Sequence, residues 1–219
     1  MILALETATN VCSVAFCDEH GGVHERRTEQ RGSHSEQLFL FVESLQKEHG
    51  FSIGDLDAVL VSEGPGSYTG LRISASAVKG LLFQHSVPLI GMNTLASFAM
   101  QARQQYPKAQ TIHSIIDARR VHVYHQQFRF QGDVLTTDDE VEVLPIKAFE
   151  KMLQSGDVVI GTGLNRISED ALSKAQTFNK SAITAESLIA LYQAGLDNFY
   201  QEEDPESFEP KYYTSNQVG

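Results

Sequence analysis

The order of predicted strands and helices in this chain repeats itself, and the repeat constrains the fold more than any other feature. The first copy has three strands, a helix and a buried strand, over 2–6, 12–17, 23–29, 33–49 and 58–62. A weaker second copy follows the same order, over 112–116, 121–130, 141–144, a helix opened by Pro145, and 157–160. Each return from helix to strand must cross a sheet, so the pattern predicts an α/β protein. We expect two lobes, 1–105 and a smaller 106–219 with a polar C-terminal tail, each with a mixed sheet covered by helices.

A glycine-rich segment joins the buried strand 58–62 to a second predicted helix, 68–85. It runs Glu63-Gly64-Pro65-Gly66-Ser67-Tyr68-Thr69-Gly70-Leu71-Arg72. Glycines at such a turn let backbone N–H groups converge, and a helix N-terminus carries partial positive charge, so the segment can hold a phosphate or carboxylate. A tight strand-to-helix turn with Ser67 as the N-cap explains the same residues. The spacing leaves both interpretations open.

Charge and cysteine content narrow the setting in which the chain works. The sequence has 17 Lys and Arg against 28 Asp and Glu, a formal net charge of −11. Such a surface repels a polyanion, so an RNA substrate is expected to be held by a partner. Cys12 and Cys17 are predicted on opposite faces of one strand, where they cannot easily bridge. No apolar run approaches the roughly 20 residues needed to span a bilayer. We expect a reduced, cytoplasmic protein without membrane contact.

Several motifs along the chain resemble one known family. They are Leu5-Glu6-Thr7-Ala8-Thr9, Gly64–Arg72, Ile116-Asp117-Ala118-Arg119 with Val123-Tyr124, and Pro210-Lys211-Tyr212-Tyr213. Together they resemble the TsaB (YeaZ) family over almost the whole chain. The resemblance implies an actin-like, Hsp70-like and sugar-kinase (ASKHA) fold.

The family resemblance also implies a function and a set of partners. It implies a scaffold subunit that dimerises with the catalytic paralogue TsaD and activates it. The product is N6-threonylcarbamoyladenosine next to the anticodon of tRNAs that read A-starting codons. TsaE is implied as a further partner and TsaC as an enzyme of the same pathway. The chain alone is expected to pair with itself as a homodimer, and to meet tRNA only indirectly.

Residues that would carry chemistry in the catalytic paralogue are missing. TsaD-type chains have a His-x-x-x-His metal pair after the strand predicted at 88–91, whereas Thr94 and Phe98 stand there in this chain. Phenylalanine cannot ligate a metal. We therefore expect no catalytic residue, no metal and no required cofactor. ATP or ADP stays a possible ligand of vestigial phosphate loops, with Gly161-Thr162-Gly163 in the second lobe and Glu6, Thr7, Thr9, Gly64, Gly66 and Ser67 in the first.

Two enzyme classes remain as alternatives. An independent actin-like ATPase or small-molecule kinase is supported only by the glycine-rich segment. A glycoprotease-type metallopeptidase lacks its metal histidines. His122 and His125 are predicted on opposite sides of a strand, and no carboxylate joins His113 or either of them at a ligating interval. Ser62 and Ser67 do not lie in a Gly-x-Ser-x-Gly elbow, so a serine hydrolase is not supported.

The two predicted helices of the first lobe have more apolar residues than a monomer core needs. Phe39 and Leu40 point away from the core stripe of helix 33–49, and the second helix has a stripe of mostly small residues from Gly70 to Leu81. Small side chains let another helix approach closely; helix 33–49 of the same chain is the competing occupant. The predicted interface consists of Leu38, Phe39, Leu40, Val42, Gly70, Ile73, Ser74, Ala77 and Leu81. A large charged side chain at Gly70 or Ala77 is expected to abolish pairing without unfolding the chain.

Overall fold

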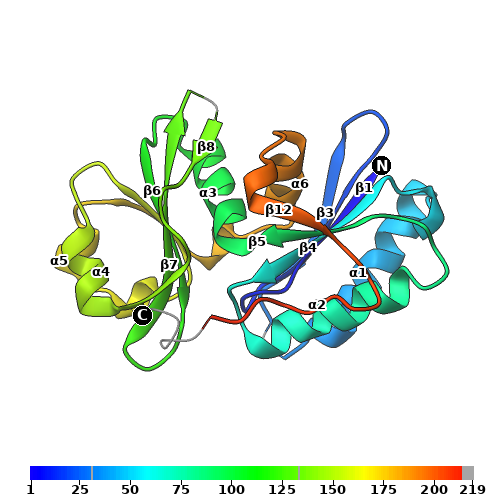
Figure 1. Cartoon of the computed structure of the whole chain (residues 1–219), viewed down its shortest axis with the longest axis horizontal. Coiled ribbons are helices and arrows are strands. Elements are labelled where there is room, and N and C mark those ends of the chain that lie inside the picture. The colour runs from blue at the N-terminus through cyan, green and yellow to red at the C-terminus, as the bar shows by residue number, and fades with distance from the viewer. Residues whose placement is uncertain (31, 133, 214–219) are drawn as a thin grey trace. The chain divides into compact units, whose positions relative to one another are not determined.

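The computed structural model describes residues 1–30, 32–132 and 134–213, which form two compact units (Figure 1). The first unit contains Met1–Thr94 and also Thr184–Lys211, and the second contains Leu95–Ile183 with the described residues Tyr212 and Tyr213. This division differs from the expected lobes 1–105 and 106–219. The chain leaves the first unit after residue 94 and returns to it, because its last strand joins the first sheet at β5 and the helix 186–193 packs on that sheet. A hydrophobic pattern predicts an element, but not the sheet to which the element returns.

The first unit is built on a six-stranded mixed sheet. Its strand order is β12-β5-β4-β1-β2-β3, with β1 at Ile2–Glu6, β2 at Cys12–Cys17, β3 at Val23–Thr28, β4 at Ala58–Gly64, β5 at Leu89–Asn93 and β12 at Tyr200–Glu203. Strands β1, β2 and β3 form antiparallel hairpins, whereas β4 pairs in parallel with both β1 and β5. Strands β2 and β4 are buried along their whole length, as expected when helices cover both faces of a sheet.

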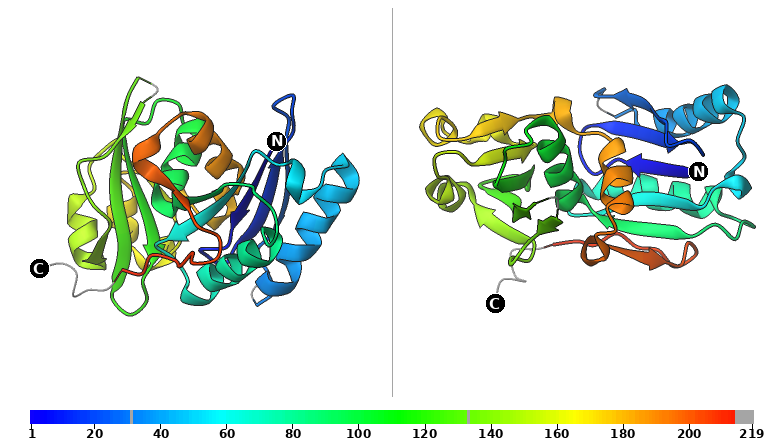
Figure 2. Two further views of the ribbon diagram at one scale, coloured as in Figure 1. Left: turned by 45° about the vertical axis from the view of Figure 1, so that its right-hand side comes forward. Right: turned by 90° about the horizontal axis from the view of Figure 1, so that it is seen from above.

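Helices α1 (His34–His49) and α2 (Tyr68–Leu81) pack on one face of this sheet, and α6 (Glu186–Gln193) packs on the other (Figures 1 and 2). Helix α1 ends at His49 and is capped by Gly50, which has a left-handed φ of 70° and whose N–H donates to the Gln46 carbonyl at 2.8 Å. Helix α2 ends at Leu81, short of the predicted 85. The chain turns there with Gln84 at a positive φ of 65°, which no helix contains.

The second unit has a sheet of the same type. Its strands are β6 (Thr111–Asp117), β7 (His122–Gln131), β8 (Val134–Thr136), β9 (Glu142–Pro145), β10 (Val158–Gly161) and β11 (Gln176–Phe178), with the short helices α4 (Ile146–Met152) and α5 (Glu169–Leu172). The strand order is β11-β10-β6-β7-β8, and β9 also pairs with β7.

Both units therefore share one topology. Numbered within each copy, the first sheet contains the order 3-2-1-4-5 in β3-β2-β1-β4-β5. The second repeats it in β9-β7-β6-β10-β11, where β9 is the strand expected at 141–144, and β8 also pairs with β7. In each copy the first three strands are antiparallel and the first pairs in parallel with the fourth. This confirms the duplication, and with it the actin-like, Hsp70-like and sugar-kinase (ASKHA) fold.

Several elements were not predicted: α3 (Thr94–Gln105), the short helix α5, the short strands β8 and β11, and the edge strand β12. Helix α3 directly follows β5, without a turn signal to mark its start. Cys12 and Cys17 are both buried and unbridged, as expected for cysteines on opposite faces of one strand. Within the part of the chain that the structure describes, no helix has the length and apolarity needed to cross a membrane.

Candidate functional site

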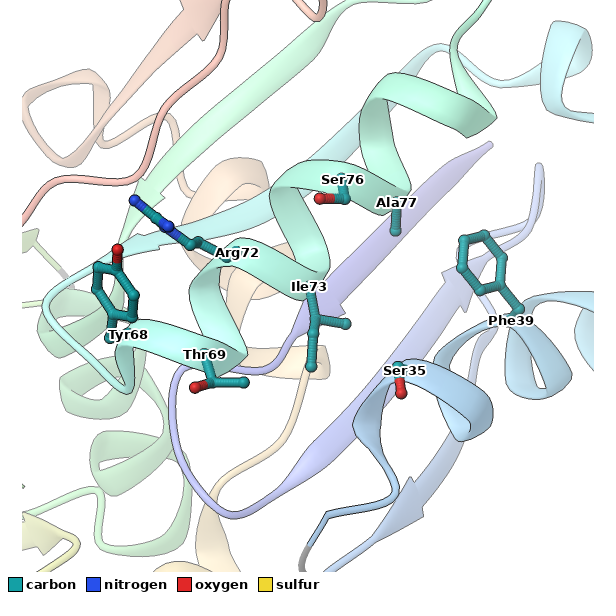
Figure 3. Close-up of a pocket in the computed structure, with 8 residues that line it drawn as sticks. All are labelled: Ser35, Phe39, Tyr68, Thr69, Arg72, Ile73, Ser76 and Ala77. Atoms are coloured by element: carbon teal, nitrogen blue, oxygen red, sulfur yellow. The ribbon is translucent and has the colours of Figure 1, made fainter.

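An open groove of about 470 Å³ lies on the first unit between α1 and α2. Figure 3 shows Ser35 and Phe39 coming from α1, opposite side chains of α2. The lining residues are Ser35, Phe39, Tyr68, Thr69, Arg72, Ile73, Ser76 and Ala77. Phe39 is 48% exposed although its ring is wholly apolar. Large apolar side chains left exposed beside one another are typical of a surface that binds another molecule.

Polar groups surround the apolar centre of this groove. The guanidinium carbon of Arg72 lies 4.0 Å from the centroid of the Tyr68 ring, and that ring is 56% exposed. The hydroxyl residues Ser35, Thr69 and Ser76 are exposed along the same two helices. An apolar centre with a polar, aromatic and arginine-containing rim is the usual anatomy of a protein–protein interface.

The groove contains only part of the predicted interface. Phe39, Ile73 and Ala77 line it. Leu40 is 48% exposed on α1 but does not line the groove, and Leu81 is half-buried against the core of the first unit.

The remaining predicted interface residues lie inside the first unit. Leu38 and Val42 are core residues, Gly70 and Ser74 are buried, and the Ser74 hydroxyl donates to the Leu71 carbonyl at 3.0 Å. These four residues are therefore not exposed for docking in the structure, because Leu38 and Val42 face the core of the first unit and Gly70 is covered by the Thr7 backbone.

The glycine-rich segment is packed against the turn between β1 and β2. A Cβ atom at Gly66 would lie 2.6 Å from the Ala8 carbonyl oxygen, and one at Gly70 would lie 2.0 Å from the Thr7 carbonyl oxygen. The Ser67 N–H donates to the Ala8 carbonyl at 2.6 Å, and the Thr7 hydroxyl donates to the Gly70 carbonyl at 2.8 Å. These glycines therefore permit a close approach between two protein backbones. A charged side chain at Gly70 is expected to disrupt the fold, which corrects the sequence-based expectation.

The segment also behaves as a capped helix start. The Ser67 hydroxyl accepts a hydrogen bond from the Gly70 N–H at 3.3 Å, which is the N-cap role that the sequence indicated. Thr9 has a similar local role, because its hydroxyl accepts from the Val11 N–H at 3.1 Å. Nucleotide binding by these residues stays a prediction.

Glu6, at the end of β1, is fully buried. The Ala8 N–H donates to one carboxyl oxygen at 2.7 Å, and the Ser62 hydroxyl donates to the other. Burial raises the pKa of Glu6 to about 7, although both hydrogen bonds oppose that rise. The carboxyl group is thus held inside the protein, with its own chain as its partner.

Thr94 and Phe98, which stand at the positions of the missing histidine pair, are both structural. The Thr94 hydroxyl accepts from the Gly64 N–H at 3.2 Å, and both side chains are fully buried on α3. Among the described residues, no three His, Cys, Asp or Glu side chains are grouped so that they could bind a metal ion.

The corresponding loop of the second unit is packed in the same way. A Cβ atom at Gly161, which has a φ of 136°, would lie 1.8 Å from the Ile115 carbonyl oxygen. The Thr162 hydroxyl accepts from the Asp117 N–H at 3.1 Å, and the Asp117 carboxylate is paired with the Arg166 guanidinium. In both units, therefore, the carboxyl group of the acidic residue that ends the first strand of the repeat (Glu6 or Asp117) has its polar partners within the same unit.

One buried polar cluster of the second unit was missed by the sequence analysis. His113 on β6 contacts His125 on β7 through ring nitrogens 3.0 Å apart, and its other ring nitrogen lies 3.2 Å from the Asp157 carboxylate. No carboxylate stands near these histidines in the sequence, but β10 pairs in parallel with β6 and brings Asp157, the residue directly before β10, to His113. The antiparallel hairpin register, which pairs Ile115 with His125, was the signal that could have revealed the histidine contact. Burial and His113 together lower the pKa of His125 to about 3.

Comparison with known proteins agrees with this arrangement. The family model for TsaD, tRNA N6-adenosine threonylcarbamoyltransferase, matches residues 7–186. The tRNA threonylcarbamoyladenosine biosynthesis protein TsaB of Escherichia coli is 32% identical over 166 residues, which are 74% of this chain and 71% of that protein. TsaB of Buchnera aphidicola subsp. Baizongia pistaciae is 24% identical over 93% of this chain and 92% of its own length. The solved structure of YeaZ from Pseudomonas aeruginosa superposes with a TM-score of 0.79 at 26% identity, over 97% of this chain and 99% of that one. The chain therefore belongs to the TsaB (YeaZ) family, a branch of the wider family that the TsaD model describes.

Proposed function

We propose that this chain is a non-catalytic subunit that pairs with a TsaD-type catalytic subunit in the synthesis of N6-threonylcarbamoyladenosine in tRNA. The groove between α1 and α2 carries this proposal, because it leaves Phe39 exposed on α1 beside the partly buried Ile73 of the adjacent α2. Two helices of a related subunit, with the same fold, can cover such a surface as a four-helix junction. Family membership supplies the pathway, since the relatives bear the name of tRNA threonylcarbamoyladenosine biosynthesis.

The packing of both glycine loops supports the non-catalytic part of the proposal. In the first unit Gly66 and Gly70 are covered by the Ala8 and Thr7 backbone, and in the second Gly161 is covered by Ile115. A loop whose open face is filled by its own protein has less room to cradle a phosphate. The chemistry, transfer of a threonylcarbamoyl group to the tRNA adenosine, then takes place on the TsaD-type subunit.

The net charge bears on tRNA and the groove bears on self-association, whereas TsaE and TsaC rest on family membership alone. A formal net charge of −11 favours indirect contact with tRNA, through the catalytic subunit. In the absence of TsaD, a second copy of this chain is the natural occupant of the groove, which gives a homodimer. TsaE is the proposed third protein of the assembly and TsaC the enzyme that supplies the activated group, all in the cytoplasm.

The groove is tested by placing a charge in it. Phe39→Asp removes the exposed ring and buries a carboxylate on docking, so it should weaken binding to TsaD by about 100-fold or more. Phe83→Asp is the matched control, because Phe83 is 67% exposed but lies outside the lining of the groove. Calorimetric titration with TsaD measures the affinity, and circular dichroism shows that both variants are folded. If the Phe39→Asp chain bound TsaD as well as the control, the docking site would lie elsewhere.

Activity is measured separately in a reconstituted reaction with TsaD, TsaC, TsaE and tRNA. Omitting this chain, or replacing it with the Phe39→Asp variant, should remove most of the modified adenosine. Full modification without the chain would contradict the activating role. ATP hydrolysis by the isolated chain would contradict the non-catalytic one.

A further inference from the structure

The segment after β12, residues 204–211, forms a C-terminal strap that runs beside α2 (Figure 1). Its first turn is closed by Asp204, whose carboxylate accepts from the Glu206 N–H at 3.2 Å and from the Ser207 hydroxyl at 2.7 Å. Phe208 then enters the core of the first unit, which also contains Ala75 and Val78 of α2, and is only 2% exposed. The strap is therefore anchored along α2 before it reaches the glycine-rich segment.

At its far end the strap holds Glu63 through Lys211. The Lys211 N–H donates to the Glu63 carbonyl at 2.7 Å, and the Lys211 ammonium donates to the Glu63 carboxylate at 2.8 Å. The Glu63 side chain is 7% exposed and the Lys211 side chain 43%. The second Glu63 carboxylate oxygen has no hydrogen-bond partner among the described residues. The ion pair thus compensates a buried charge with an ammonium group that is itself open to water.

The backbone around this ion pair is shaped to admit it. A Cβ atom at Gly64, whose φ is 128°, would lie 2.4 Å from the Lys211 carbonyl oxygen. A Cβ atom at Gly91 on β5 would lie 2.8 Å from the Glu63 carboxylate. Only glycine lets the strap cross at the first position and lets the carboxylate lie over β5 at the second. This close fit marks the contact as specific.

Glu63 and Gly64 stand immediately before the turn that starts α2. Ser67 caps that helix, and the next residues, Tyr68 and Thr69, already line the groove. A displacement of the Glu63 backbone therefore moves the first turn of α2, and with it one end of the groove. The strap can act on the docking surface without touching a docked partner.

We propose that Lys211 is a positioning residue for docking: its ammonium group fixes Glu63, and through Glu63 the start of α2, in the arrangement that a partner recognises. This inference rests on the proposed function of the groove for its effect on binding. Its effect on the α2 start does not depend on any partner.

The charges around Glu63 give the proposal a pH signature. Burial raises the pKa of Glu63, the Lys211 ammonium opposes the rise, and the Glu203 carboxylate on β12 adds to it. These are the charged groups that act on Glu63 among the described residues. Without Lys211 the pKa rises further, so the ionised carboxylate is uncompensated at high pH and becomes protonated as the pH falls. The effect of losing Lys211 on the start of α2 and on partner binding is therefore expected to be largest at high pH.

Three variants of the full chain separate charge from packing. Lys211→Met leaves Glu63 ionised and unpaired, and at about pH 8 it should speed amide exchange at 64–72 and weaken TsaD binding, each by about tenfold, with a smaller change at about pH 6. Glu63→Gln with Lys211→Met removes both charges and should restore both properties at both pH values. Lys174→Met removes one exposed positive charge from the second unit and serves as the control.

The outcomes of these measurements distinguish the positioning role of Lys211 from the proposed function of the groove. Lys211→Met behaving like Lys174→Met in exchange and in affinity would overturn the positioning role. A double variant as defective as Lys211→Met, with no dependence on pH, would also overturn it, because packing of the lysine stem would then be responsible. If the unmodified chain failed to bind TsaD while exchange at 64–72 responded as expected, the proposed function would fall and the control of the α2 start by Lys211 would stand.

Discussion

Gly70 illustrates how much a single residue depends on its neighbours. Its place in a glycine-rich segment fits a phosphate loop, and its place on α2 fits a helix–helix contact. The structure gives a different reason, since the Thr7 carbonyl occupies the space that a side chain would need. Gly80, on the same helix, has nothing within 4 Å of a Cβ atom. The two glycines are alike in the sequence and different in the fold.

This difference predicts opposite effects of one substitution. Gly70→Ala forces the β1–β2 turn away from α2 and should lower the free energy of unfolding by about 2–4 kcal/mol. Gly80→Ala replaces a flexible helical residue at an open position and should raise it by up to about 1 kcal/mol. Urea denaturation of both variants measures the two changes. Equal effects would show that the Thr7 contact does not restrain this position.

The site residues could be predicted only as far as they depend on local sequence. The N-cap role of Ser67 follows from its place before a helix and is confirmed. The hydrogen bond from the Ser62 hydroxyl to the Glu6 carboxyl group joins residues far apart in the chain, so no local spacing reveals it. The same holds for the contact between Lys211 and Glu63. Such contacts need the sheet order and register before they can be inferred.

At the scale of elements, periodicity predicted the long helices and the hairpin strands. Helix α1 and strands β1 and β2 agree closely with the expected ranges, because an amphipathic stripe or an alternating run repeats over their whole length. Helix α3 was missed, because it begins directly at the end of β5. Strand β12 was missed because its sequence, Tyr200-Gln201-Glu202-Glu203, is polar, and only pairing with β5 at the sheet edge makes it a strand.

The β6, β7 and β10 strands of the second unit hold a cluster that should make its stability depend on pH. The pKa of His125 in the folded state is about 3, against an ordinary value of 6.5. As the pH falls through 6.5, the unfolded chain takes up a proton that the folded chain refuses, so stability is lost on going down toward pH 3. Above that range His125 is neutral in both the folded and the unfolded state, so it does not change the free energy of unfolding with pH. The loss expected by about pH 4.5 is on the order of 2–3 kcal/mol.

Replacing the imidazole ring of His125 tests whether this residue causes the loss of stability at low pH. His125→Phe cannot take up a proton, so the free energy of unfolding should fall less steeply between about pH 7 and pH 4.5 than in the unmodified chain. His20→Phe is the control, because the His20 side chain is 84% exposed and its removal should leave the slope unchanged. Urea titrations at several pH values provide the slopes. An unaltered slope in His125→Phe would assign the acid sensitivity to other groups.

On the scale of the whole molecule, the first unit is assembled from both ends of the chain. Residues 1–94 supply five strands and the groove helices, and Thr184–Lys211 supply α6, β12 and the strap. The expected boundary near 105 could not reveal this, since it followed the order of the repeats along the sequence. The duplication itself was predictable, because each copy has its own local pattern of strands and helix.

A shortened chain tests this dependence. A chain that ends at Ile183 lacks α6, which covers β1, β2 and β4, and lacks β12 at the edge of β5. Amide exchange should then speed up in β1–β5, while peptides from β6, β7 and β10 keep their protection and serve as the internal reference. Unchanged protection in β1–β5 would mean that the first sheet is stable without the returning segment.

The same returning segment has a consequence during translation. Residues that begin the docking surface leave the ribosome early, but Phe208 and Lys211, which anchor the strap beside that surface, emerge only after the whole segment Leu95–Ile183 of the second unit. A nascent chain therefore has the groove helices without the elements that complete their unit. Premature termination yields a product that should not compete with the finished protein for its partner. Because the strap is synthesised after the second unit, docking of the groove on a partner should be delayed until residue 211 has been added.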